Sequence, residues 1–166
     1  RFPFEVFYDS NGVCGEKSKL LAYFLRSFGF ETALFEFEKE NHESIGIKCP
    51  SQYSFKNTGY CFIESTSPSI TTDSDGNYLG AGKLESTPEI LKISDGKSFD
   101  SVIEEFEDNL KYQKLLKDSN QDSFKEFTAL RAKYGFQEES CDSNKNFCSG
   151  FCWPSCEKHF LFKCTE

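Results

Sequence analysis

The sequence predicts an α+β fold in one domain that spans residues 1–166. Three observations support this prediction: apolar residues at helical spacing near the N-terminus, three strand-like segments after them, and two amphipathic stretches further along the chain. A chain of this length can bury a core of its own. Its 19 phenylalanines make that core aromatic.

The first helix is expected over residues 15–28, and Gly29 ends it. Five apolar side chains repeat there at helical spacing: Leu20, Leu21, Phe24, Leu25 and Phe28. The strand-like segments follow as ETALFEFE (31–38), HESIGIKC (42–49) and GYCFIEST (59–66). Together these elements predict a helix packed on an antiparallel sheet.

Residues 67–97 are rich in Ser, Thr, Gly and Asp, with one short apolar run at 89–93. The segment DSDGN within them predicts a polar turn rather than a calcium loop, because its glycine comes too early and no glutamate stands twelfth. Amphipathic helices are expected at about 99–117 and 121–134. The domain therefore divides into a core (1–97), a helical part (98–135) and a cysteine-rich tail (136–166).

The charge excludes one class of partner. A net charge of −8 and a pI near 4.9 leave no basic stripe for a nucleic acid. No apolar run approaches the ~18 residues of a transmembrane helix, so no membrane insertion is expected within this chain. The start of the chain does not have the pattern of a signal peptide.

Eight cysteines and no methionine are typical of an oxidising compartment. We therefore predict an extracytoplasmic or secreted protein, with a cytoplasmic location as the alternative. Five of the eight lie in the tail: Cys141, Cys148, Cys152, Cys156 and Cys164. If Cys14 is a free thiol, seven cysteines remain, so at least one more cannot be bridged within the chain.

Disulfides are the favoured use of the tail cysteines, and zinc is the alternative. A zinc set of Cys148, Cys152, Cys156 and His159 has plausible spacing but lacks a C-x-x-C knuckle. We expect the tail to fold back over the strand layer as a clasp that is cross-linked within itself, with Cys49 or Cys61 as candidate partners in the sheet. Trp153 would then pack over the core or at the rim of a cleft.

Cys14 stands where a loop meets the first helix. The positive end of the helix dipole lowers the pKa of a thiol in this position and favours the thiolate. Gly12 and Gly15 leave room beside it for a substrate and for a backbone N–H facing an oxyanion. The alternative is a cysteine that is buried or bridged.

His42 and Glu64 could supply a base and its orienting acid. By strand alternation His42 points away from the apolar side of its segment, and Glu64 shares a face of the next strand with Tyr60 and Phe62. In an antiparallel hairpin His42 can lie across from Glu64, whose carboxylate would fix the imidazole tautomer. The alternative is a solvent-facing histidine beside an ordinary surface glutamate.

These segments resemble the core of the transglutaminase-like superfamily, in particular its short microbial members. The resemblance lies in GVCGEKSKLLAYFLRSFGF, NHESIGIKC and GYCFIEST, with FPFEVFY similar to the Pro-x-Glu segment that often precedes the nucleophile. It covers about residues 3–67. The family shows a G-x-C-x-(D/E)-K-(A/S) helix start, a strand that begins with His, and a strand that ends in an acid followed by Thr.

The resemblance implies a papain-like fold, a thiol acyl-transfer site without a cofactor, and a protein or peptide substrate. It implies Cys14 as nucleophile, His42 as base and Glu64 as orienter. Glu64 departs from the aspartate that the family commonly has. The tryptophan that many eukaryotic members use around the oxyanion has no counterpart, and Asn11 or Tyr8 are the candidates to replace it.

The hairpin register bears on the cysteines. If His42 faces Glu64, Cys49 and Cys61 lie four residues apart along the sheet, roughly 13 Å at strand rise. A disulfide needs Cα atoms within about 7 Å. A regular hairpin therefore permits the triad or a Cys49–Cys61 bridge but not both, and we predict the triad.

Three functions from different classes fit these residues. The favoured one is a cysteine peptidase or amidase, or a transglutaminase that uses an amine. Hydrolysis is preferred, because the chain is small and has no obvious second domain to shield a thioester. The alternatives are a non-catalytic binding or structural module on the same fold, and a metal- or redox-active domain built on the tail.

Overall fold

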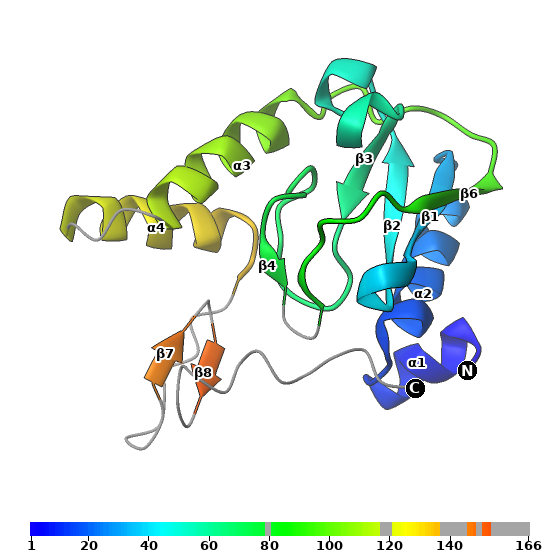
Figure 1. The fold of residues 1–166 in the computed structure, drawn as a ribbon, viewed down its shortest axis with the longest axis horizontal. Coiled ribbons are helices and arrows are strands. Elements are labelled where there is room, and N and C mark those ends of the chain that lie inside the picture. The colour runs from blue at the N-terminus through cyan, green and yellow to red at the C-terminus, as the bar shows by residue number, and fades with distance from the viewer. Residues whose placement is uncertain (79–80, 117–120, 137–145, 149–150, 154–166) are drawn as a thin grey trace.

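A computed structural model describes residues 1–78, 81–116, 121–136, 146–148 and 151–153 (Figure 1). Its centre is a four-stranded antiparallel sheet in the order β3-β2-β1-β6, with helices around it, which confirms the α+β class. The strands are β1 (Thr32–Phe37), β2 (His42–Lys48), β3 (Tyr60–Ile63) and β6 (Glu89–Ser94). The short 3₁₀ helices are η1 (Glu38–Glu40), η2 (Ser51–Tyr53) and η3 (Phe55–Asn57). The short strands are β4 (Asn77–Tyr78), β5 (Gly82–Lys83), β7 (Asn146–Cys148) and β8 (Phe151–Trp153).

Helix α2 (Cys14–Ser27) confirms the first predicted helix, and it begins at the candidate nucleophile. The carboxylate of Glu16 accepts the backbone N–H of Val13 at 3.1 Å, so the chain enters the helix with this donor satisfied. Hydrogen bonding to the Arg1 guanidinium lowers the pKa of Glu16 to about 2, and the Val13 N–H adds to this effect.

A short helix, α1 (Pro3–Asp9), precedes α2 and was not among the expected elements. Pro3 suits a first helical position because its missing N–H would have no partner there. The Glu5 carboxylate accepts the N–H of Phe2 at 2.7 Å. The sequence contains this helix-start pattern, Pro3 followed by Glu5, but the helix is too short to show a periodic repeat of apolar residues.

Both faces of the sheet are covered. On one face α2 packs through Ala22 against Leu34 and Ile45. The other face holds an aromatic cluster, with Phe35, Phe37, Phe55, Phe62 and Tyr78 among its members. Gly46 is needed in this layer, because a Cβ there would lie 2.9 Å from the Phe35 ring.

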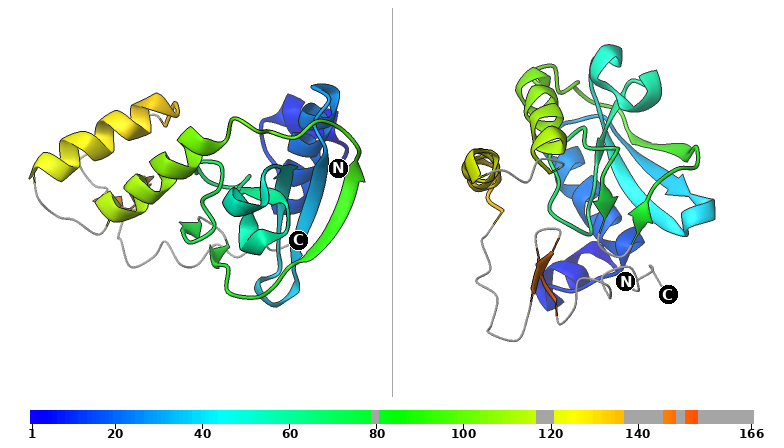
Figure 2. Two further views of the ribbon diagram at one scale, coloured as in Figure 1. Left: turned by 90° about the horizontal axis from the view of Figure 1, so that it is seen from above. Right: turned by 60° about the vertical axis from the view of Figure 1, so that its left-hand side comes forward.

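Two helices follow the sheet, as predicted, and lie beside each other away from it (Figure 2). These are α3 (Ile103–Leu116) and α4 (Gln121–Lys133). The rings of Tyr112 and Phe127 stack between them at 5.1 Å. None of the described helices combines the length and the apolarity that a membrane crossing requires.

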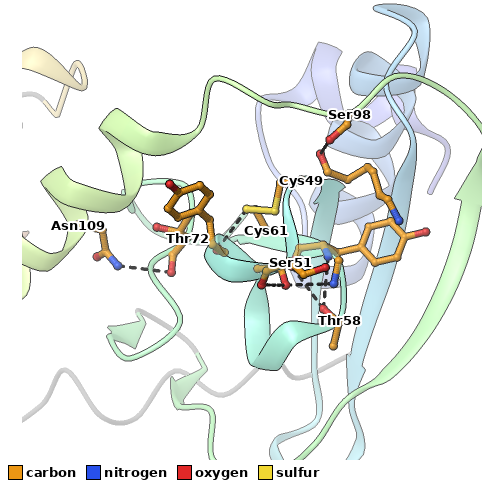
Figure 3. The surroundings of a disulfide bond; sticks show 12 residues. Cys49, Ser51, Thr58, Cys61, Thr72, Ser98 and Asn109 are labelled. Atoms are coloured by element: carbon orange, nitrogen blue, oxygen red, sulfur yellow. Dashed lines mark hydrogen bonds between the residues drawn. A yellow bond between two sulfur atoms is a disulfide. The ribbon is translucent and has the colours of Figure 1, made fainter.

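The Cys49–Cys61 disulfide overturns the predicted choice between bridge and triad. The two Cα atoms are 5.7 Å apart, and Figure 3 shows the bond at the end of β2. Lys48 pairs with Tyr60. This register lies midway between the one that would align His42 with Glu64 and the one that would align Cys49 with Cys61. Both contacts are therefore diagonal, between residues offset by two positions from direct pairing. The same hairpin holds both the bridge and the His42–Glu64 contact.

The same bond excludes a link from either cysteine to the tail. The sulfurs of Cys49 and Cys61 lie in a buried cluster with Ile47 and Val102. The bridge therefore ties the end of β2 to β3, and Val102, which precedes α3, packs against it. The rest of the expected clasp falls outside the described residues.

Replacing Cys49 and Cys61 together by alanine should destabilise the domain by about 3 kcal/mol, the chain-entropy value for so short a loop. The loop has a sequence separation of 12 residues. Urea unfolding of the variant and of the parent protein measures the difference. Equal unfolding free energies would mean that the bridge adds nothing to the packing of this cluster.

Candidate active site

His42 and Glu64 meet at the end of the sheet where β2 begins and β3 has just ended. The Nε2 atom of His42 lies 2.9 Å from Oε2 of Glu64, and both side chains are fully buried. The predicted contact is therefore confirmed as geometry. A buried imidazole that contacts a carboxylate through Nε2 exchanges protons with any third group through Nδ1.

The second carboxylate oxygen of Glu64 is held separately. Oε1 accepts the backbone N–H of Ser65 at 2.9 Å, the N–H of Thr66 at 2.8 Å and the hydroxyl of Thr66 at 2.6 Å. All three contacts donate to the oxygen, so Glu64 is fixed in orientation with Oε2 toward His42. The Ser-Thr pair after the acid, quoted above for the family resemblance, has this structural role here.

The surroundings of His42 differ from the expectation. The sequence pattern placed it away from the apolar side of its strand, whereas it is 4% exposed and its ring lies 6.4 Å from that of Phe37. The reason is that the second face of the sheet is also buried, under the aromatic cluster. Neither a solvent-facing histidine nor an ordinary surface glutamate describes this pair.

Cys14 is buried at the first position of α2 and is one half of a disulfide bond. Cys49 and Cys61 are bonded to each other, so its partner lies outside the residues whose side chains are described. Among the described cysteines none is free. The expectation of a free Cys14 thiol is therefore wrong for this state of the protein. The inference that at least one of the other seven cysteines stays unbridged depended on that free thiol and no longer holds.

The first turn of α2 lies against the start of β2. The carboxylate of Glu43, the residue after His42, comes within 3.4 Å of the position that a Cβ would have on Gly15. Burial raises the pKa of Glu43, and Lys19 at 3.5 Å opposes the shift. Cys14 and His42 therefore belong to elements that touch at this end of the sheet. Helix α2 lies on the face of the sheet that carries Ile45, and the His42 ring lies on the opposite face.

The two oxyanion candidates occupy the surface near α1. Tyr8 is 88% exposed, and the backbone carbonyl of Asn11 accepts a hydrogen bond from the Arg1 guanidinium at 3.0 Å. Asn11 lies three residues before Cys14 in the loop between the helices. Stabilisation of an oxyanion requires exclusion of water, so a role for Tyr8 would need a substrate to cover it.

A second buried acid lies near the pair. Asp73 is 3% exposed, and its Oδ1 accepts a hydrogen bond from Gln113 of α3 at 2.8 Å. Tyr78 donates to the Asp73 carbonyl, and its ring lies 5.7 Å from that of Phe62. Burial raises the pKa of Asp73 to about 6, and the charge of Glu64 contributes. The expected polar turn therefore carries its first acid inward.

Replacing Asp73 by Asn should stabilise the protein at neutral pH. The folded-state pKa of Asp73 lies above its usual 3.8, so the folded protein keeps a proton that the unfolded chain has released between pH ~4 and ~6. Stability falls as the pH rises through that window. The variant should gain about 3 kcal/mol at pH 7 and nothing below about pH 4.

Urea unfolding at both pH values measures this difference. The exposed Asp75, two residues further in the same turn, provides the matched Asp→Asn control and should change stability little at either pH. A gain for D73N that does not depend on pH would contradict the burial of an ionised carboxylate.

The side chains of Cys148, Cys152, Trp153, Cys156 and His159 all fall outside the described residues. In the part of the chain that the structure does describe, no cluster of His, Cys, Asp or Glu is arranged to hold a metal ion.

Comparison with known proteins does not assign this chain to a group: no family model, no curated protein and no solved structure matches it.

Proposed function

We propose that the reduced protein catalyses acyl transfer from peptide or side-chain amides through Cys14, His42 and Glu64. The observation that carries this proposal is the buried His42–Glu64 pair, with its 2.9 Å contact and a carboxylate oriented by three further donors. A protein gains little stability from such a pair compared with apolar residues of similar volume. A pair that orients a base for catalysis accounts for this arrangement.

The chemistry has two steps. The Cys14 thiolate attacks the amide carbonyl, the C–N bond breaks, and the His42 imidazolium gives its proton to the departing amine. The resulting thioester is attacked by water or by an amine, whose proton passes to His42, and Cys14 leaves as a thiolate. Throughout, Glu64 holds the imidazole in one tautomer and stabilises its charged form. We expect the Cys14 sulfur to come within about 4 Å of Nδ1 of His42, around the end of the sheet where β2 begins.

The disulfide at Cys14 sets a condition on this activity. A sulfur in a disulfide is not a nucleophile, so the reaction belongs to the form in which a thiol reductant has opened that bond. The bond also favours a second function, a structural or binding module in which Cys14 is a permanent cross-link. The two proposals differ in one property, the reactivity of Cys14 after reduction.

An activated ester tests the proposal without knowledge of the substrate. The full chain is reduced under native conditions, mixed with p-nitrophenyl acetate, quenched in acid and mapped by mass spectrometry. We expect a burst of nitrophenolate and one acetyl group on Cys14, and neither in a Cys14→Ser variant. Acetylation that is no faster in the folded than in the unfolded reduced chain would favour the structural module.

Hydrolysis is the proposed outcome, with a protein or peptide as substrate. A peptide mixture supplied with and without a primary amine distinguishes the two reactions by their products. Free acids in both cases indicate a peptidase or amidase, and amine-tagged products indicate a transglutaminase. The described disulfide supports an oxidising compartment, which we propose as the location.

A further inference from the structure

Ser18 lies one helical turn after Cys14 and joins three elements of the candidate site. Its side chain is completely buried, and its Oγ lies 3.0 Å from the carbonyl oxygen of Glu43 and 2.9 Å from Oγ of Ser65. A serine hydroxyl has one proton to donate, and that of Ser18 donates to the Glu43 carbonyl. The Ser65 hydroxyl is therefore the donor of the second contact.

These two partners are the sequence neighbours of the candidate base and its acid. Glu43 follows His42 at the start of β2, and Ser65 follows Glu64 after the end of β3. Ser65 also donates its backbone N–H to the Glu64 carboxylate. One hydroxyl on the nucleophile helix therefore contacts both chain segments that hold the pair.

We infer that Ser18 is a positioning residue, which fixes the first turn of α2, and so Cys14, relative to His42 and Glu64. The inference rests on the proposed function, because it assigns Ser18 a purpose only if Cys14 reacts. Reaction geometry is sensitive to displacements of about 1 Å, so one shared hydroxyl at the junction of three elements can govern the rate. Ser18 does not itself touch the reacting atoms.

Ser44 makes a matched comparison. It is also completely buried and lies on β2, two residues after His42, but its hydroxyl has no hydrogen-bond partner. Removing either hydroxyl deletes one buried oxygen from the same end of the sheet. Only the Ser18 hydroxyl connects the helix to the strands.

The experiment compares Ser18→Ala with Ser44→Ala in the full chain after native reduction. The rate of alkylation of Cys14 by iodoacetamide is followed at pH 6 and pH 9, and thermal unfolding is recorded alongside. For S18A we expect the rate at pH 6 to fall at least about tenfold and the rate at pH 9 to stay within about twofold, because only the low-pH reaction needs the imidazole. S44A should match the parent protein at both pH values, and Ser18→Thr, which keeps the hydroxyl, should restore the pH 6 rate.

A role in stability alone would lower the melting temperature of S18A and leave its ratio of pH 6 to pH 9 rates unchanged, which would overturn the inference. If S18A does not fold, Ser65→Ala removes only the contact between Ser18 and Ser65. We then expect a smaller fall in the ratio of the pH 6 rate to the pH 9 rate. An unchanged ratio contradicts the positioning role. If the parent protein itself shows no reaction at pH 6, the proposed function fails and the role of Ser18 fails with it. A reactive parent with an equally reactive S18A refutes the positioning role alone.

Discussion

Replacing Glu64 by Gln should lower the rate of Cys14 acylation in the reduced protein by about 10³–10⁴-fold, the scale on which a wrong imidazole tautomer acts. The geometry determines which way the new amide points. Three donors surround the position of Oε1, so the amide oxygen must stay there and the NH₂ group must face Nε2 of His42. Nε2 then accepts, Nδ1 carries the proton, and the ring cannot take a proton from the thiol.

The fold should tolerate this change. Every hydrogen bond of Glu64 has an equivalent in the variant, so we expect E64Q to lose no more than about 1–2 kcal/mol. By contrast, Glu64→Ala removes the buried carboxylate that contacts His42 and accepts three further hydrogen bonds, and should cost about 3–5 kcal/mol. Activity of E64Q within tenfold of the parent would contradict the role of the tautomer.

Glu31 offers a matched control for E64Q. Its carboxylate accepts the Tyr60 hydroxyl at 2.7 Å, away from His42, and this hydrogen bond lowers the pKa of the acid. Glu31→Gln therefore removes a partnered carboxylate from the same domain without touching the pair. The acylation rate of E31Q should stay within about threefold of the parent.

Opening the disulfide at Cys14 should switch the protein from inert to reactive. The oxidised protein offers no thiolate, so acylation should be undetectable before reduction and complete at Cys14 after it. Cys49 and Cys61 are even less exposed than Cys14, so mild dithiothreitol should open the Cys14 bond first. Mass mapping with differential alkylation reports which cysteines are free at each reductant concentration.

The control is Cys14→Ser, which should stay inert under every condition. Equal reactivity of the oxidised and reduced forms would place the nucleophile elsewhere. Acylation of reduced C14S at the rate of the parent would do the same. A reduced protein that unfolds before Cys14 reacts would identify the bond as a structural cross-link.

Local patterns in the sequence predicted much of the fold. The helical repeat before Gly29 and the alternation in the next three segments gave α2, β1, β2 and β3 to within a few residues. Alternation also placed His42 and Glu64 on the same side of neighbouring strands, which is why their contact could be predicted. Helix α1 and strand β6 were missed, one for its length and one because its partner, β1, is distant in the sequence.

The register of the β2–β3 hairpin could not be derived in the same way. The loop between the strands contains η2 and η3, so no tight turn fixes the pairing. Diagonal contacts then allowed Cys49 to reach Cys61 while His42 reached Glu64. The burial of Asp73 and the bonds of Ser18 depend on contacts between distant segments, which no local pattern records.

The rate at which iodoacetamide alkylates Cys14 across pH 5–9, in the natively reduced and in the unfolded protein, tests the central claim most directly. A thiol paired with an imidazole that Glu64 orients is a thiolate in mild acid. We therefore expect the folded protein to react at pH 6 at least about 100-fold faster than the unfolded chain, with a rate that is nearly flat up to pH 9. A folded protein whose rate rises with pH as the unfolded chain's does would show that the His42–Glu64 pair does not act on Cys14.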